Sequence, residues 1–260
     1  MKRARLHTWE ACRDGWRSLA QQPRLLLGFS LACLSGHLLG WGLFAAADAV
    51  DSGVLAALLH LVGLTLYSGS LLWLVEGLSR AGLAQVQGHP LSWDELMHWR
   101  SRSIRRLLLC LINLAAALAA TATISFVLWS LLVLVLPAMS VVPALLGLIT
   151  AAGLGLSQLF APCLLLDTRL NPAAIFRQGA LLLEHHWAGL LLLSGALAGL
   201  LLCPLLVGLL AEAVVAGVGV AATALALVVV LPLSATTVTA AYQQLSPEVQ
   251  ARVGVSRAVR

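Results

Sequence analysis

The sequence predicts an all-α integral membrane protein, and three properties of the 260-residue chain lead to this class. Hydrophobic residues make up 60% of the chain and charged residues only 10%, against about 25% charged in a typical soluble domain. The mean hydropathy is +0.93. Several uncharged apolar runs also reach the roughly 20 residues that a helix needs to cross a bilayer. A soluble single-core protein and a disordered chain are therefore excluded.

Six apolar runs are the expected transmembrane helices. The first follows a basic leader, but its apolar stretch exceeds the roughly 7–15 residues of a secretory signal, so we expect a retained helix. The sixth is expected to continue as helix to about Leu245. The runs cover residues 25–47, 54–75, 107–136, 141–166, 187–210 and 214–233.

Basic residues occur on one side of these helices only. All 16 Lys and Arg residues fall in the leader, in the second and fourth connections, or in the tail. The opposite side carries Asp48, Asp51 and Glu212 in short turns. The positive-inside rule then places both termini in the cytoplasm. The expected location is the bacterial cytoplasmic membrane, with the chain passing through it several times.

Three cytoplasmic segments have the pattern of amphipathic helices that lie on the membrane surface. The leader repeats apolar residues at helical spacing, the second segment holds a capping box, and the third begins with Asn171 as cap and Pro172 at the first helical position. The residues concerned are Trp9, Cys12, Trp16 and Leu19 in the leader, and Ser92 to Glu95 in the second segment.

Each of these segments leads into a transmembrane hairpin. We therefore predict three hairpins, each preceded by an interfacial helix, in one six-span domain over residues 1–246 with a basic tail at 247–260. The layout suggests three repeats, at 1–88, 89–170 and 171–246. Residue identity between the three units is slight. The alternative therefore stays open that they share only the regular layout of any protein with an even number of spans.

Small residues four apart predict close contacts between helices. Gly36 and Gly40, and likewise Gly195 and Gly199, form GxxxG patterns. Such strips let two helices approach closely, either within one chain or between two copies. The alanines at positions 116 and 120 are a weaker analogue. Three prolines, Pro162, Pro204 and Pro232, interrupt the last three runs, either as simple kinks or as part of a transport site.

Five polar residues are expected at one depth in the membrane. A rise of 1.5 Å per residue places them about 9–14 Å below the outer surface. Because imidazole in hydrocarbon needs a partner, we expect a polar layer with the two histidines facing the bundle interior. This layer serves packing alone or forms a transport or proton-linked site. The candidates are His37, His60, Thr121, Thr150 and Thr223.

The sequence offers no motif for catalysis, a cofactor, a metal or nucleic acid. His185 and His186 are adjacent, so a helix points them about 100° apart, and they cannot easily clasp one ion. We interpret them, with Glu184, as a titratable cluster near anionic headgroups. No nucleophile elbow, phosphate-binding loop or dinucleotide fingerprint is present.

Five segments carry a family resemblance: the tryptophan-containing leader and residues 88–96, 165–167, 171–176 and 232–242. Together they resemble a family of uncharacterised bacterial integral membrane proteins named after the membrane domain of glycerophosphoryl diester phosphodiesterases. The resemblance spans nearly the whole chain. It implies six helices in the cytoplasmic membrane and carries over no catalytic residue.

Three classes of function follow as hypotheses. The leading one is a non-enzymatic accessory protein that interacts with lipids or assists assembly of a complex. The alternative is a small-molecule transporter or channel, and an intramembrane enzyme comes third. The expected partners are the bilayer and anionic headgroups on the cytoplasmic side, while a protein partner or homo-oligomer stays open.

Overall fold

The computed structural model describes residues 6–89, 91–168 and 170–258, and all regular secondary structure in these ranges is helical. Six helical segments are long and apolar enough to cross a membrane, which confirms a polytopic, all-α membrane protein. These six segments are Pro23–Asp48 (α2), Gly53–Val86 (α3), Ser101–Val135 (α5), Val141–Asp167 (α6 and α7), Pro172–Val214 (α8) and Gly219–Pro247 (the membrane part of α9).

The shorter elements lie between or before these segments. Helix α1 is Thr8–Gln21, α4 is Trp93–Met97, and a single 3₁₀ turn, η1, covers Pro137–Met139. The fourth segment consists of α6 (Val141–Ser157) and α7 (Ala161–Asp167), and α9 extends from Gly219 to Ala258. Residues 247–258 of the expected tail therefore continue the last helix.

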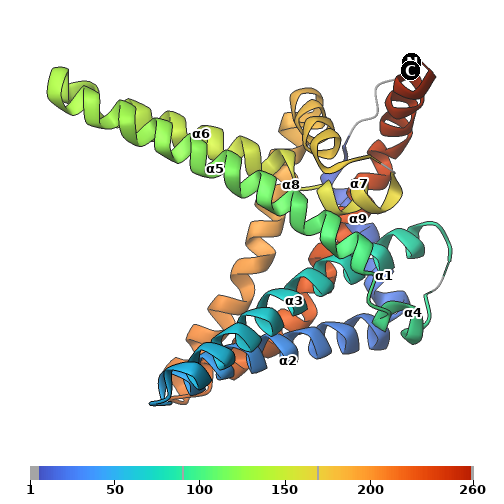
Figure 1. The fold of residues 1–260 in the computed structure, drawn as a ribbon. Coiled ribbons are helices and arrows are strands. Elements are labelled where there is room, and N and C mark those ends of the chain that lie inside the picture. Colours follow the sequence, from blue (N-terminus) through green and yellow to red (C-terminus); the bar gives the residue numbers. More distant parts are fainter. Residues whose placement is uncertain (1–5, 90, 169, 259–260) are drawn as a thin grey trace.

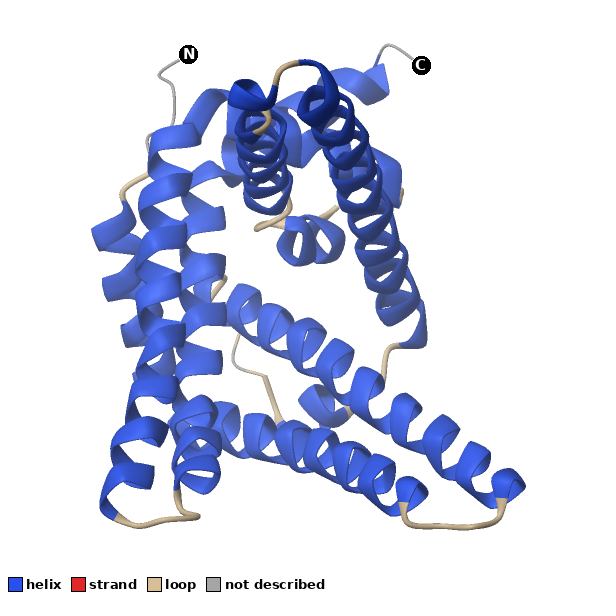
Figure 2. Ribbon diagram, turned by 90° about the vertical axis from the view of Figure 1, so that its left-hand side faces the viewer, coloured by secondary structure: helices blue, strands red, loops and turns tan. Residues whose placement is uncertain are grey.

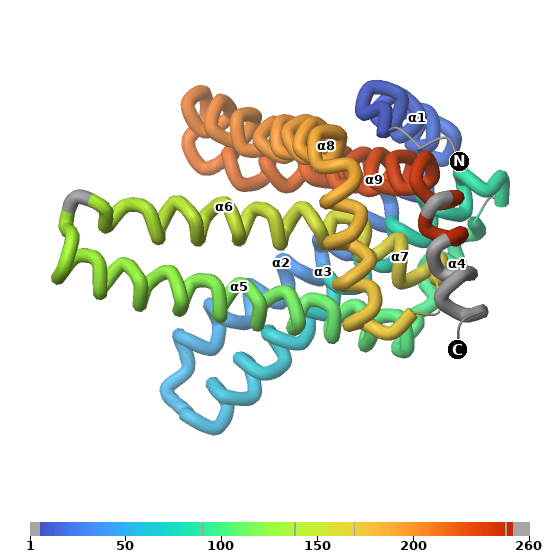
Figure 3. Tube along the Cα trace, turned by 90° about the horizontal axis from the view of Figure 1, so that it is seen from above, coloured from blue at the N-terminus to red at the C-terminus, as the bar shows by residue number. Residues whose placement is uncertain are grey.

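Helices that follow one another in the chain run side by side in three pairs, α2 with α3, α5 with α6, and α8 with α9 (Figures 1 and 2). Seen from above, the three pairs project in the same direction (Figure 3). Their connecting turns form three separate tips. Helices α1, α4 and α7 lie at the opposite end, together with the described ends of the chain. We call this end the base.

The packed core lies at the base rather than between the tips. One cluster joins α1, α3, α5, α7, α8 and α9 around Phe160, Leu164, Ile175 and Tyr242. A second cluster joins the four helices α1, α2, α3 and α4 around Leu26, Phe29 and Leu96. By contrast, no residue in the most apolar 18-residue stretch of α5 is buried. Since lipid chains are as apolar as leucine, the hydrophobic effect does not drive the outer halves of the three pairs together.

The fourth membrane segment is broken, as its proline predicts. Residues 158–160 form a turn between α6 and α7, and Pro162 stands in the first turn of α7. Proline has no N–H to offer the carbonyl of Gln158 and fits the start of a helix. The N–H of Ala161 donates to that carbonyl instead, at 2.9 Å. Pro204 and Pro232, in contrast, lie inside continuous helices.

The sixth segment begins at Gly219 and not at residue 214 as predicted. Val214 is the last residue of α8, and the turn between the two helices needs Gly217, whose φ is +86°. This left-handed conformation is costly for any residue with a Cβ atom. The Glu212 carboxylate accepts hydrogen bonds from the N–H groups of Gly217 and Gly219, both at 2.8 Å, and so ties the turn to α8.

The predicted capping signals are confirmed at the base. The Ser92 hydroxyl accepts from the N–H of Glu95, and the Glu95 carboxylate accepts from the N–H of Ser92, which completes a capping box. Hydrogen bonds from the Ser92 backbone and side chain lower the pKa of Glu95. The stabilisation from this box is thus present above the ordinary glutamate pKa and is lost as the pH falls through the lowered value. Asn171 likewise accepts from the N–H of Ala174.

Helix α8 bends where the sequence places the start of the fifth membrane helix. Helix α8 extends from Pro172 to Val214 but is kinked at His186, whose angles, φ −131° and ψ 24°, are not helical. The predicted surface segment and the predicted membrane segment are therefore two arms of one kinked helix.

Candidate functional site

The five predicted intramembrane polar residues do not gather in the structure. His37 lies on the face of α2 that contacts α3, where its Nδ1 is 3.2 Å from the carbonyl oxygen of Tyr67. The two rings also stack, with centroids 3.8 Å apart. His37 is thus partnered within its own hairpin, by contacts that serve packing.

His60 lies on the surface of the hairpin, contrary to the prediction that it faces the interior. Its side chain is 48% exposed, its Nδ1 is 2.9 Å from the carbonyl oxygen of Ala56, and its Nε2 is 3.4 Å from a carboxylate oxygen of Asp48. Counting 1.5 Å per residue gives the depth of a side chain but not its direction around the helix. Asp48 in the acidic turn provides the partner of His60 at the surface.

The three threonines bond within their own helices. Thr121, Thr150 and Thr223 each donate to the carbonyl four residues earlier, at 2.8–2.9 Å. This local bond satisfies a hydroxyl in hydrocarbon without any tertiary partner. Among the described residues, no hydrogen bond joins any two of the five candidates. The shared layer that a transport site requires is therefore not formed.

The base contains a buried ion pair that was not predicted from the sequence. Glu76 is 1% exposed and Arg80 is 7% exposed, and their side chains meet at 3.4 Å between Oε1 and Nη1. Arg80 Nη2 also donates to the carbonyl of Leu96 at 2.9 Å and so joins α3 to α4. The sequence signal was present, since a glutamate four residues before an arginine is a helical pair. Its burial could not be read from spacing.

A second buried contact joins α7 to α9. The Tyr242 hydroxyl donates to a carboxylate oxygen of Asp167 at 2.7 Å, and Tyr242 is fully buried. Both residues belong to segments on which the family resemblance rests. Asp167 therefore anchors a helix end rather than merely ending an apolar run.

Helix α1 packs on α9, a contact that was not predicted from the sequence. Its buried residues are Ala11, Gly15, Ser18 and Leu19. A Cβ atom at Gly15 would lie 2.7 Å from the backbone of Thr237, so the helices touch at a distance that only a small residue allows. The tryptophans are too bulky for this contact. Trp9 and Trp16 are consequently 80% and 58% exposed.

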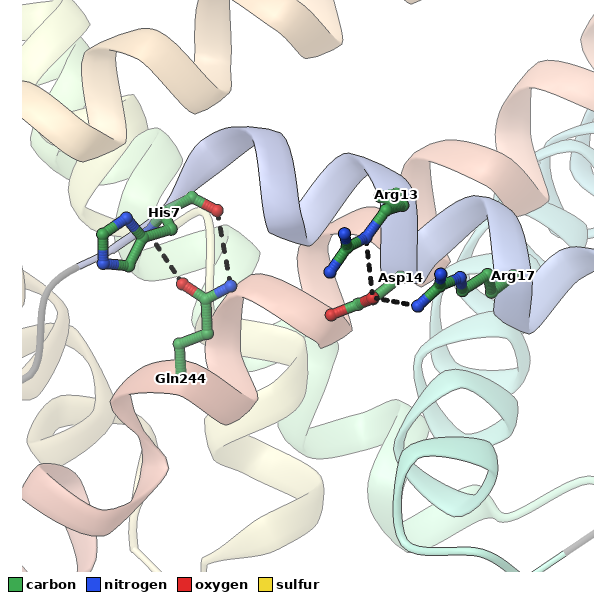
Figure 4. A network of polar contacts seen from close by, with 5 residues as sticks. All are labelled: His7, Arg13, Asp14, Arg17 and Gln244. Atoms are coloured by element: carbon green, nitrogen blue, oxygen red, sulfur yellow. Dashed lines mark hydrogen bonds and ion pairs between the residues drawn. The ribbon is translucent and has the colours of Figure 1, made fainter.

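The outer side of α1 is divided into an aromatic and a charged strip. Trp9 and Trp16 are seven residues apart and so share one flank of the helix. On the next flank, Arg13 and Arg17 both approach the same carboxylate oxygen of Asp14, each at 3.7 Å (Figure 4). All three charged side chains are about half exposed or more. Aromatic rings beside arginines suit a helix in the headgroup layer of a membrane.

The comparisons with known proteins give no relative: no family model, no curated protein and no solved structure matches this chain.

Proposed function

We propose that this chain is a non-enzymatic accessory protein of the bacterial cytoplasmic membrane, with three hairpins, both termini in the cytoplasm and a base that contacts anionic lipid headgroups. Its role is lipid handling or the assembly of a larger complex. Membership of the family that the sequence resembles is part of the same proposal.

One observation carries the proposal: charge is divided between the two ends of the hairpins. The tips hold Asp48, Asp51 and Glu212 and no Lys or Arg, whereas every Lys and Arg residue that the structure describes belongs to a segment of the base. A basic excess beside one membrane surface attracts anionic lipids and marks the cytoplasmic side. The exposed tryptophans of α1 lie at that same end.

The transporter alternative loses its main support because the five polar candidates form no common layer. The hairpins also splay above the base, so we propose no pathway between them. In the accessory role, the basic and aromatic surface at the base contacts the lipid headgroups.

Labelling of single cysteines is expected to show the tips outside and the base inside. Ser52 and Val142 are exposed at two tips, so a cysteine at either position should react with an impermeant maleimide added to intact cells freed of their outer membrane. Gln250 is exposed at the base, and a cysteine there should react only after lysis. The nearby Ser246 is buried and would resist the reagent from either side. Each cysteine is introduced into a chain whose five native cysteines are replaced by serine, and that cysteine-free chain is the control. Reaction at Gln250 in intact cells would overturn the proposed orientation.

Fluorescence quenching should place Trp9 and Trp16 among the headgroups. The chain has 8 tryptophans, so the contribution of these two is obtained by subtracting the signal of the W9F/W16F variant from that of the unaltered protein in vesicles. We expect lipids brominated near the glycerol to quench this difference signal more than aqueous iodide does. Stronger quenching by iodide would mean that α1 faces water, which contradicts the proposed lipid contact.

A further inference from the structure

A shallow hollow at the base brings together three histidines from two distant parts of the chain. It has a volume of about 260 Å³ and is lined by His7, just before α1, and by His185, His186 and Trp187 at the bend of α8. The bend matters because it places the hollow where the surface arm of α8 meets its membrane arm. Trp187 is 61% exposed beside it, as expected for a ring at the membrane interface.

The backbone around His7 is held in place, so the hollow is a built feature rather than a chance approach. The N–H of His7 donates to Gln244 Oε1 at 2.8 Å, and Gln244 Nε2 donates back to the carbonyl of His7 at 3.4 Å (Figure 4). The Thr8 hydroxyl donates to the carbonyl of Gly189 at 3.4 Å. Helices α1, α8 and α9 thus meet at this point.

The hydrogen bond of His185 decides what its ring presents to a ligand. Nδ1 is 2.9 Å from the carbonyl oxygen of Leu181. Because a carbonyl oxygen only accepts, Nδ1 carries a hydrogen and donates it. In the neutral ring Nε2 then offers a lone pair, whereas in the protonated ring it offers an N–H. The phosphodiester group of a phospholipid has only acceptor oxygens at neutral pH, so it pairs with the protonated ring.

We propose that this hollow binds the phosphate group of an anionic phospholipid, with the rings of His7 and His185 as donors, and that protonation of the histidines strengthens binding. The inference rests on the proposed function in taking the base as the membrane surface. The carboxylates closest in sequence to these histidines are Glu10 on α1 and Glu184 on α8, both exposed, while α9 contributes the uncharged Gln244. Neither carboxylate is among the residues that line the hollow.

The test is a titration of the full-length protein in neutral detergent with short-chain phosphatidylglycerol at pH 6 and pH 8. Histidine changes its charge between these values, so we expect tighter binding at pH 6. The H7Q/H185Q variant should bind about tenfold more weakly at pH 6, because it loses charge-assisted hydrogen bonds. The matched control is H98Q, which removes an exposed histidine at the end of α4, elsewhere on the base. It should bind like the unaltered protein.

Two further ligands separate the sources of phosphate. Inorganic phosphate and short-chain phosphatidylcholine should both bind more weakly than phosphatidylglycerol. Equal binding of inorganic phosphate would assign the hollow to a free anion and overturn the lipid assignment, as would equal binding of phosphatidylcholine. Unchanged affinity in H7Q/H185Q, or affinity independent of pH, would overturn the site itself. Since the titration is done in detergent, its failure leaves the labelling and quenching results on orientation untouched.

Discussion

Replacing Glu76 with alanine is expected to lower the free energy of unfolding by about 3–5 kcal/mol, the cost of leaving a buried charge without its partner. Arg80 would keep its hydrogen bond to the carbonyl of Leu96 but lose the only carboxylate within ion-pair distance in the described structure. Both side chains are nearly inaccessible to water, so solvent cannot replace the lost charge.

The exposed pair of α1 provides the matched comparison. Arg17 contacts Asp14 at 3.7 Å with both side chains about half exposed or more, and the R17A variant should lose less than about 1 kcal/mol. Unfolding of each variant in detergent, followed by tryptophan fluorescence, measures the difference. The double variant E76L/R80M removes both charges and should recover most of the stability. Equal effects of E76A and R17A would contradict a buried, energetically important pair.

The G40L variant is expected to separate α2 from α3 near their tips and to destabilise the protein by about 1–3 kcal/mol or more. A Cβ atom at Gly40 would lie 2.6 Å from the backbone nitrogen of Tyr67 and 2.8 Å from the carbonyl oxygen of Gly63. Backbone atoms of a packed helix cannot turn aside as a side chain can. The helices would therefore have to move apart, and the contact of His37 with Tyr67 would open with them.

Gly199 is the control for this prediction because it belongs to the other GxxxG pattern. Nothing lies within 4 Å of a Cβ atom built at Gly199 or at Gly195. The G199L variant should thus unfold at nearly the same temperature as the unaltered protein. Thermal unfolding and gel filtration of the two variants check this contrast. A loss of stability in G199L as large as in G40L would show that the contact geometry does not decide the outcome.

Much of the fold follows from the sequence alone because it depends on properties local to each segment. A run of apolar residues the length of a bilayer has to form a helix, since backbone groups find no other partners in lipid. Six such segments are present, and the caps at Ser92 and Asn171 and the break before Pro162 occur where the residues predict. Each of these features is set by neighbours only a few positions away.

Only the tertiary structure decided which way the side chains of these helices point. Most membrane helices here are apolar on all sides, so periodicity marks no preferred face, and the depth of His60 predicted nothing about its direction. The same holds for Gly40 and Gly199, which share one motif but differ in what faces them. Glu76 and Arg80 are buried by neighbours that are distant in the chain. For the same reason α1 buries its small residues and not its tryptophans. Spacing within a helix fixes relative angles, whereas contact between helices fixes which of those angles is buried.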